Sequence, residues 1–435
     1  MIPLIEYQKR RHHLAMSLPK DAIAVIPAAS ETVRNGDAHY RFRQDSDFYY
    51  LTGFNEPEAL LLITGGRESV SILFNRARDP LQEQWVGRRL GQDEALTTLG
   101  VDEAYPLSSL QEQLPELLSG KRTIYYSMGR YPHWEKQLFK AWQTVKGKIR
   151  QGIVAAESFT DLAPIMGEMR LFKSPAEIVL MQKAAQISVA AHLRAIQSCN
   201  KASHEYQLQA ELLYEFTRQG AINVAYEPIV AAGANACVLH YTKNDAPLRR
   251  GDLVLIDAGC EFENYAADIT RTIPLSGRFS PEQRLIYDLV LRAQSAGIAA
   301  VKPGVPWNAI QQTMVHILTE GLVDLEILQG TVDELIEQEA YKPFYMHGSG
   351  HWLGLDVHDS GSYKTEGLWR SLEPGMVLTV EPGLYFSPTL SHIDSRWLGI
   401  GVRIEDDIQV TKEGGVNLSK ELPVAIDSLE ALVRG

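Results

Sequence analysis

The chain has 435 residues, of which 45% are hydrophobic and 22% are charged, and its net charge is −12. This length and composition predict a soluble globular protein with two domains and ample core. The acidic balance argues against nucleic acid or an anionic membrane as a partner, and no apolar run reaches the roughly 20 residues that a transmembrane helix needs.

The first residues and the cysteines predict the same compartment. The opening MIPLIEYQKRRHH carries charges where an export signal needs its apolar core. The spacings of Cys199, Cys237 and Cys260 fit neither a disulfide framework nor a zinc site. The sequence therefore predicts a cytoplasmic protein.

Residues 1–172 are predicted to form an α/β domain with a mixed sheet, because helical and strand-like segments alternate. The predicted helices are Ile5–Leu18, Leu110–Leu118 and Pro132–Val145, and the predicted strands are DAIAVIPAA, DFYYLTGF, ALLLITGG, SVSILFN and RTIYYSM. The domain has no Gly-rich phosphate loop, since GRRLGQ is too short and lacks the Lys-Ser/Thr ending.

The segment EQWVGRRLG places Trp85 beside Arg88 and Arg89 in a predicted loop. Two interpretations are open. The segment is either a surface loop with one buried indole, or a loop whose indole contacts a ligand.

Residues 173–435 are predicted to form a second domain that opens with a helix. Ser174, Pro175 and Glu177 have the pattern of an N-cap, a first-turn proline and a capping-box glutamate. His192 lies on the apolar stripe of that helix, which predicts a packed core histidine and not a ligand.

Further helices are predicted at His204–Gln219, from Ser280 and from Pro306. The order helix–helix–strand–strand occurs twice along the domain. This pattern predicts an α+β domain in which helices cover one face of a curved antiparallel sheet.

Residues 253–275, LVLIDAGCEFENYAADITRTIPL, are predicted to form a hairpin with strands at Leu253–Ile256 and Ala267–Leu275. Asp257 ends the first strand and Asp268 begins the second, so the two carboxylates face each other. Two ionised carboxylates in a dry site need a cation or a proton between them. The alternative is a pair of ordinary turn acids in water.

Two more stretches carry residues that are unusual for strands. In YMHGSGHWLGLDVHD, His347, His351 and His358 cluster among glycines that permit close backbone approach, which favours a site over three structural histidines. In MVLTVEPGLY, Glu381 closes an apolar strand, where burial without a cation is costly.

The stretch GIGVRIEDDIQV alternates as a strand, so that Arg403 and Glu405 share one face. A solvated ion pair is the alternative interpretation of those two residues. Asp406 falls on the apolar face and marks a bulge or a strand end.

Together these stretches supply two aspartates, two glutamates and one histidine. Four carboxylates carry too much charge for one divalent ion and suit two ions about 3.5–4 Å apart. Oxygen-rich ligation without thiolate favours manganese, with zinc or cobalt as alternatives. A water that bridges two such ions becomes a hydroxide nucleophile near neutral pH, which predicts metal-assisted hydrolysis.

The stretches IDAGCEFENYAADITRT, HGSGHWLGLDVHD, TVEPGLY and GVRIEDD, with LHYT around His240, resemble the metallopeptidases of the pita-bread fold, and most closely those of the aminopeptidase P type. RQDSDFYYLTGFNEPEA, WVGRRLG and EMRLFKSPAEI extend the resemblance to nearly the whole chain. It implies a C-terminal pita-bread domain, residues 173–435, after an N-terminal α/β domain, residues 1–172.

The resemblance also implies roles. Asp257 would hold one metal ion, Asp268 and Glu405 would bridge both, and His351 and Glu381 would complete the other. Glu381 would also carry a proton to the leaving nitrogen.

In the same way, His240 and His358 would steady the substrate carbonyl, and Arg403 would support Glu405. His347 and Tyr385 would bind the substrate, with His347 lining the pocket for proline. In His347-Gly-Ser-Gly-His351, relatives vary the two residues before the second histidine, which should tune the pocket and leave metal ligation intact.

The implied substrate is a peptide with proline at its second position, cleaved after the first residue. Trp85 would pack on that substrate, from its own or a neighbouring subunit of a homo-oligomer, a tetramer or a dimer. The alternatives are a prolidase restricted to Xaa-Pro dipeptides and a metal-free binding module of the same fold, which would lack at least one ligand.

Overall fold

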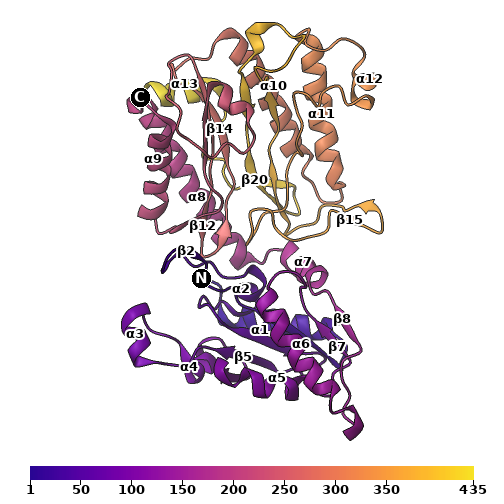
Figure 1. Cartoon of the computed structure of the whole chain (residues 1–435). Coiled ribbons are helices and arrows are strands. Elements are labelled where there is room, and N and C mark those ends of the chain that lie inside the picture. The colour runs from indigo at the N-terminus through magenta and orange to yellow at the C-terminus, as the bar shows by residue number, and fades with distance from the viewer. The chain divides into compact units, whose positions relative to one another are not determined.

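The computed structural model describes all residues, Met1–Gly435, and the chain divides into two compact units, Met1–Arg170 and Leu171–Gly435 (Figure 1). None of its helices combines the length and the apolarity needed to traverse a lipid bilayer.

The N-terminal unit is built on a mixed six-stranded sheet with the strand order β6-β5-β4-β1-β7-β8. Strand β4 pairs antiparallel with β1 and β5, whereas β7 runs parallel to β1. Its elements are α1 (Leu4–Ser17), β1 (Ala22–Pro27), β2 (Val33–Asn35), β3 (Ala38–His39), α2 (Ser46–Thr52), β4 (Leu60–Thr64), β5 (Ser71–Asn75), α3 (Pro80–Val86), α4 (Gly91–Thr98), β6 (Glu103–Pro106), α5 (Leu110–Leu118), β7 (Thr123–Tyr125), α6 (Pro132–Lys146), β8 (Ser158–Thr160) and α7 (Ala163–Leu171), the last of which crosses the boundary. The mixed sheet predicted from the sequence is confirmed.

Strand β1 is buried along its whole length, because helices cover both faces of the sheet. Ile23 and Val25 belong to the core that includes residues of α5 and α6, while α1 contacts β4 and α2. This explains why the β1 sequence is a continuous apolar run and does not alternate.

The predicted strand DFYYLTGF is wrong, because Ser46–Thr52 form helix α2. Asp45 caps it by accepting a hydrogen bond from the Phe48 backbone N–H at 2.9 Å, and Gly53 ends it with φ of 65°. The helix is buried on every side, so it lacks the polar face that identifies a helix in a sequence, and its aromatic residues favour strands.

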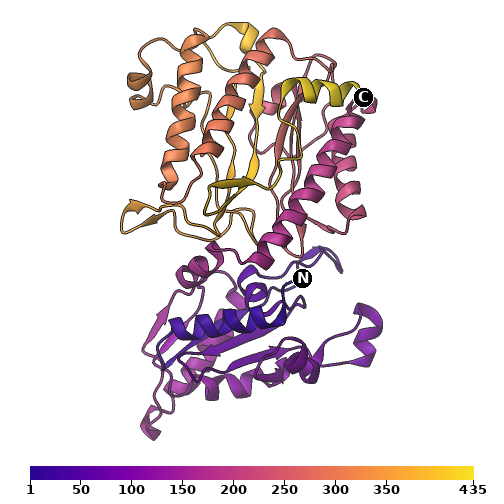
Figure 2. The same ribbon diagram turned by 180° about the vertical axis from the view of Figure 1, so that it is seen from behind.

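The C-terminal unit holds two helix pairs, α8 with α9 and α10 with α11, around small antiparallel sheets. Figures 1 and 2 show α8 and α10 on the same side of the strands, and both helices contact strands of this unit. The elements are α8 (Pro175–Ser198), α9 (Glu205–Arg218), β9 (Asn223–Val224), β10 (Ile229–Ala232), β11 (Leu253–Asp257), β12 (Cys260–Phe262), β13 (Tyr265–Ala266), β14 (Thr270–Pro274), α10 (Pro281–Ala300), α11 (Trp307–Asp324), α12 (Val332–Glu337), β15 (Lys364–Thr365), β16 (Leu368–Trp369), β17 (Val377–Val380), β18 (Gly383–Tyr385), β19 (Gly401–Arg403), β20 (Asp406–Val410), β21 (Gly415–Asn417) and α13 (Ile426–Arg434).

The predicted helix starts are confirmed in the C-terminal unit. Ser174 and Glu177 form a capping box at α8, and Ser280 and Gln283 form another at α10. His192 is fully buried, and its Nε2 lies 2.9 Å from the Ala258 carbonyl oxygen. The burial confirms the prediction of a packed core histidine, and it lowers the pKa of His192 to about 4.

The predicted hairpin is confirmed, since β11 pairs antiparallel with β14 and Asp257 lies opposite Thr270. The second strand begins at Thr270, after Asp268. The turn region is itself a small hairpin of β12 and β13, in which Glu263 and Asn264 have φ of 52° and 64°. Two left-handed residues match the twist of such a two-residue turn.

Two strand predictions need correction. The stretch from His347 to Asp359 is irregular and contributes only an isolated bridge between Trp352 and Leu378. Its glycines permit tight packing, since a Cβ at Gly350 would lie 2.0 Å from a backbone oxygen.

The other correction concerns GVRIEDD, which splits into β19 and β20. Asp406 begins β20, so the interpretation as a strand end is confirmed, and its carboxylate accepts a hydrogen bond from the buried Arg271 at 2.8 Å. That bond explains an acid on an otherwise apolar face.

Candidate active site

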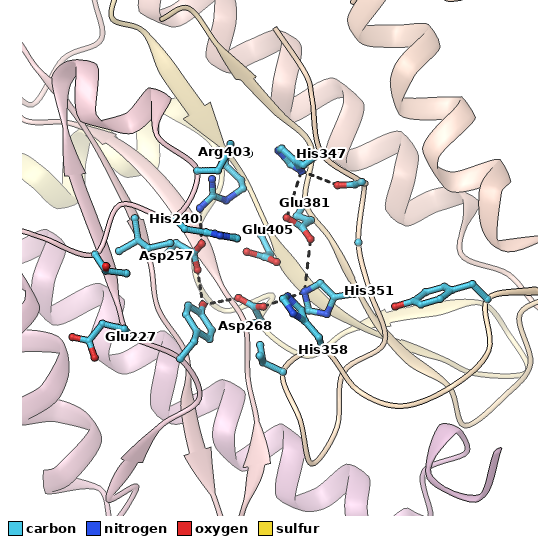
Figure 3. Close-up of a pocket in the computed structure, with 18 residues that line it drawn as sticks. Glu227, His240, Asp257, Asp268, His347, His351, His358, Glu381, Arg403 and Glu405 are labelled. Atoms are coloured by element: carbon cyan, nitrogen blue, oxygen red, sulfur yellow. Dashed lines mark hydrogen bonds and ion pairs between the residues drawn. The ribbon is translucent and has the colours of Figure 1, made fainter. Parts of the chain in front are cut away.

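The C-terminal unit contains a cavity of about 580 Å³ that collects nearly all of the predicted site residues. Figure 3 shows the side chains converging on it from several strands and loops. Its lining includes five carboxylates (Glu227, Asp257, Asp268, Glu381, Glu405), one guanidinium (Arg403) and four imidazoles (His240, His347, His351, His358).

The acids reach the cavity because each lies at or near the end of a strand. Asp257 is the last residue of β11, and Asp268 precedes β14 by two positions. Glu381 follows β17 directly, and Glu405 lies in the break between β19 and β20. The β11–β14 and β17–β20 pairings, with an isolated bridge between Thr270 and Glu405, bring the four ends together in space.

Asp268, His351 and Glu405 form the tightest group of possible metal ligands. Their ligand atoms all lie within 4.8 Å of one another. His351 Nε2 is 3.3 Å from Asp268 Oδ2 and 3.7 Å from Glu381 Oε1. The Thr270 hydroxyl donates to Glu405 Oε2 at 2.7 Å and so fixes that carboxylate from behind.

Asp257 lies on the other side of the group and has two strong partners. Arg403 Nη2 lies 2.5 Å from Asp257 Oδ2. The Tyr226 hydroxyl is 2.5 Å from an oxygen of Asp257 and 2.5 Å from an oxygen of Asp268. Tyr226 therefore joins the two aspartates.

Sequence reasoning missed Tyr226 and Glu227. They belong to the segment YEPIVA, which enters β10, and β10 pairs with β11 so that Ile229 lies opposite Asp257. If the pairing of β10 with β11 had been predicted, Tyr226 would have been expected close to the two aspartates.

The buried acids repel one another strongly. Burial, followed by the charges of Asp268 and Glu381, raises the pKa of Glu405 well above its usual range. Burial also raises the pKa of Glu381 to about 7, although His351 opposes the shift. Burial alone would lower the pKa of His351, but the hydrogen bond to Asp268 and the nearby acids raise it to about 9.

These shifts share one physical meaning, which is that the site favours added positive charge. The pKa values of carboxyl groups and of one imidazole are raised because a single arginine cannot balance four crowded acids. Divalent cations would supply the missing charge, and oxygen ligands with one imidazole suit hard or borderline ions. The residues present therefore fit a metal site.

Comparison with known proteins agrees with this geometry. Residues 179–412 match metallopeptidase family M24, and residues 7–125 match the N-terminal domain of aminopeptidase P. The chain belongs to metallopeptidase family M24. The resemblance inferred from the motifs is thereby confirmed, and as a member of this family the protein is a peptidase.

Similar proteins cover nearly all of the chain. The Xaa-Pro aminopeptidase of Escherichia coli K12 is 46% identical over 98% of this chain and 97% of its own length. The Xaa-Pro aminopeptidase of Haemophilus influenzae is also 46% identical, over 99% of this chain and 98% of its own length. Among solved structures, the aminopeptidase PepP of Pseudomonas aeruginosa has a TM-score of 0.97 and 48% identity, covering 100% of this chain and 98% of its own.

A zinc-substituted aminopeptidase P of E. coli in complex with product also has a TM-score of 0.97 and is 46% identical. The match covers 100% of this chain and 98% of that structure's chain. These likenesses confirm the predicted fold class, an N-terminal unit with a mixed sheet followed by an M24 pita-bread domain.

Within this M24 pocket, His347 and Tyr385 form a linked pair. His347 Nε2 lies 2.8 Å from the Tyr385 hydroxyl, which accepts a hydrogen bond from Arg403 at 3.0 Å. Burial, together with the charge of Arg403, lowers the pKa of His347 to about 4. Tyr385 is only 1% exposed and is absent from the lining, so it reaches the pocket through His347.

The other two histidines border the pocket differently. The His358 ring lies edge-on to His351 with ring centroids 4.4 Å apart, and burial lowers the pKa of His358. His240 is exposed and lies on the loop after β10.

Trp85 differs from the sequence interpretation. It lies in helix α3 and not in a loop, and it is 86% exposed, so the alternative of a buried indole is wrong. It is not among the residues that line the pocket of this chain.

Proposed function

We propose that this protein removes the first residue from peptides whose second residue is proline, with two divalent cations held by the pocket. The observation that carries the proposal is the 46% identity to an E. coli Xaa-Pro aminopeptidase along 98% of this chain. The pocket supports it, because its five acids, one arginine and four histidines are suited to hydrolysis assisted by cations.

Asp257, Asp268, His351, Glu381 and Glu405 would hold the ions, with Asp268 and Glu405 shared between them. Bound divalent cations supply Lewis acidity, which activates water and polarises a carbonyl. Manganese is the proposed metal, since four of the five ligands are carboxylates, with zinc and cobalt as alternatives.

Glu381 accepts the proton of the attacking water and delivers it to the prolyl nitrogen that leaves. A group that accepts and returns a proton works best when its pKa is close to the working pH. Burial moves the pKa of Glu381 in that direction, to about 7. Thr379 Oγ1 lies 3.4 Å from Glu381 Oε1, so the carboxylate has a nearby donor that limits its rotation.

His240 and His358 donate hydrogen bonds to the substrate carbonyl oxygen and to the tetrahedral intermediate that follows. Arg403 holds Asp257 through one Nη atom and the Tyr385 hydroxyl through the other. His347, supported by Tyr385, lines the part of the pocket that receives the proline ring.

The preference for proline has a physical basis. A prolyl bond has no N–H to offer and a rigid φ, so general peptidases that bind an extended backbone handle it poorly. A pocket in which the His347 ring packs edge-on against Tyr345, at 5.0 Å between centroids, offers a firm aromatic wall for a small ring.

Trp85 completes the substrate site of a neighbouring subunit in a homotetramer, or in a dimer. An indole that is 86% exposed leaves a large apolar surface in water, and contact with a partner or a substrate would remove it. Trp85→Ala should lower kcat/KM for peptides longer than a dipeptide. Ile149→Ala, which removes another exposed apolar side chain of the same unit, is the control.

The working compartment is the cytoplasm, where its three free cysteines remain reduced. The two domains comprise residues 1–172 and 173–435, with the second beginning at the Ser174 capping box that starts α8.

The deciding experiment compares an Xaa-Pro dipeptide with an Xaa-Pro-Xaa tripeptide as substrates of the manganese-loaded protein. Cleavage of the tripeptide after its first residue is expected. Strong activity on the dipeptide with none on the tripeptide would identify a prolidase instead. Absence of hydrolysis of both, with manganese bound, would favour a binding module and refute the proposal.

A further inference from the structure

The loop that carries His240 is fastened to the first turn of α9 by one buried carboxylate. Glu205 is the first residue of α9 and is 0% exposed. Oε1 accepts hydrogen bonds from the Ala232 backbone N–H at 2.7 Å and from Asn235 Nδ2 at 3.0 Å. Oε2 accepts from the Tyr241 hydroxyl at 2.8 Å and from the Ala246 backbone N–H at 2.9 Å.

One donor, Ala232, is the last residue of β10, and the other three come from the segment between β10 and β11. None of them is a cation, so the buried charge is stabilised by hydrogen bonds and by the N-terminal end of the α9 dipole. Each oxygen of this carboxylate accepts two hydrogen bonds, so the carboxylate has one preferred orientation. The four groups that donate to it are fixed in the same way.

Tyr241 is the donor adjacent to His240. Leu239 and Tyr241 pack against a small apolar cluster that includes Ile229 and Leu255, and Leu239 also lines the pocket with His240 and Thr242. Tyr241 is therefore the one residue from Leu239 to Thr242 that does not line the pocket. The hydrogen bond from Tyr241 to Glu205 therefore fixes, from behind, the backbone that presents the His240 imidazole.

The far end of the loop has an anchor of its own. Asn244 is 0% exposed and has φ of 50°. Its Nδ2 donates to the Pro228 carbonyl at 2.8 Å, and its Oδ1 accepts from the Val230 backbone N–H at 2.9 Å. Loss of the Tyr241 bond would therefore loosen the segment around His240 and leave the loop ends in place.

We propose that Glu205, acting through the Tyr241 hydroxyl, is a positioning residue that sets the orientation of His240 in the pocket. The inference rests on the proposed role of His240 in steadying the substrate carbonyl. A hydrogen bond to a developing negative charge requires its donor to be placed closely, because a displacement of about 1 Å can cost about 10²-fold in rate.

The test is a double-mutant cycle on the manganese-loaded protein with an Xaa-Pro-Xaa tripeptide. Tyr241→Phe keeps the packed ring and removes only the hydroxyl, and it should lower kcat about tenfold with KM changed less than about twofold. His240→Ala should lower kcat by about 10²-fold. In the His240→Ala background, Tyr241→Phe should lower kcat by less than about twofold further, because the residue on which it acts is gone.

Tyr287→Phe is the matched control. The Tyr287 hydroxyl donates to the Val424 carbonyl at 2.8 Å, the residue is fully buried, and it does not line the pocket. It should lower the unfolding temperature about as much as Tyr241→Phe does and leave kcat unchanged. Glu205→Gln should lower kcat at least as much as Tyr241→Phe. If the Glu205→Gln variant does not fold, the double-mutant cycle of Tyr241 and His240 tests the inference by itself.

Three results would overturn the inference, in two distinguishable ways. A tenfold or larger loss in His240→Ala with kcat unchanged in Tyr241→Phe, or equal losses for Tyr241→Phe in both backgrounds, would refute the positioning role alone. Unchanged kcat in His240→Ala would refute the proposed role of His240 and the positioning role with it.

Discussion

Each unit of this protein buries a cluster of acids, and the two clusters differ in how their charge is balanced. In the N-terminal unit, Arg170 Nη1 lies 2.8 Å from Asp47 Oδ1, and Arg130 Nη2 lies 3.0 Å from Asp45 Oδ2. Tyr131 also donates to Asp45 at 2.9 Å. Each acid thus has a cationic partner of its own.

In the C-terminal pocket, four crowded acids (Asp257, Asp268, Glu381, Glu405) share one guanidinium, and Arg403 is already paired with Asp257. Two other buried acids of the same unit have cationic partners: Lys173 Nζ lies 2.9 Å from Asp359, and Arg271 Nη2 lies 2.8 Å from Asp406. Buried Glu205 has no cationic partner, but four hydrogen-bond donors stabilise it. The pocket differs from all of these because several acids crowd around one guanidinium, and such crowding favours a cation site.

The largest effect should come from removing the metal ions. Treatment with a chelator should abolish peptide hydrolysis, by at least about 10³-fold, because activation of water is lost. Added manganese should restore it, and the unfolding temperature of the C-terminal unit should rise with manganese concentration. Full activity after removal of all divalent ions, checked by elemental analysis, would contradict the metal assignment.

Glu405→Gln should separate activity from stability. It removes a proposed bridging ligand, so kcat/KM should fall by at least about 10²-fold. In the metal-free protein the free energy of unfolding should not fall, since the substitution relieves repulsion from Asp268 and Glu381 and an amide oxygen can still accept from Thr270. A loss of more than about 2 kcal/mol in urea denaturation would show that the acid is structural.

Asp47→Asn should give the opposite pattern. It removes one charged partner of Arg170, whose guanidinium is 2% exposed, and should reduce the free energy of unfolding by about 2 kcal/mol. Below the unfolding temperature kcat/KM should stay within about twofold of the parent. The loss should be smaller when Asp47→Asn is made in an Arg170→Met background, and an equal loss there would indicate that the pair is not the cause.

The smallest effect is a pH dependence of the metal-free protein. Burial raises the pKa of Glu381 from an ordinary 4.5 to about 7, so the folded state binds more protons between these values and stability should fall as pH rises through this window. His351, with its pKa raised from 6.5 to about 9, contributes stability that is complete below pH 6.5 and is lost by pH 9.

Thermal unfolding in chelator at several pH values should therefore show the unfolding temperature falling by a few degrees or more toward alkaline pH. Glu381→Gln should make the unfolding temperature depend less on pH below about pH 7. An unfolding temperature that rises with pH over this range would contradict the predicted direction of the effect.

The sequence was sufficient for features that depend on near neighbours. The capping boxes at Ser174 and Ser280 follow from residues three positions apart, and the β11–β14 hairpin follows from two apolar runs around a polar turn. The acids at strand ends were recognisable because each interrupts an apolar run. Helix α2 was mistaken for a strand because tertiary burial removed the polar face that local patterns need.

What the sequence by itself determined is the inventory of the site and its class: four acids and a histidine in an order that resembles the M24 family, with helix starts that frame the domain. What only the tertiary structure decided is the arrangement. Tyr226 joins two aspartates, Arg403 supports Asp257, and Glu205 supports the His240 loop, and each of these contacts links residues at least 27 positions apart. The physical reason is that a buried charge is stabilised by whichever donors the folded chain brings within about 3 Å of it, and no local pattern in the sequence encodes that proximity.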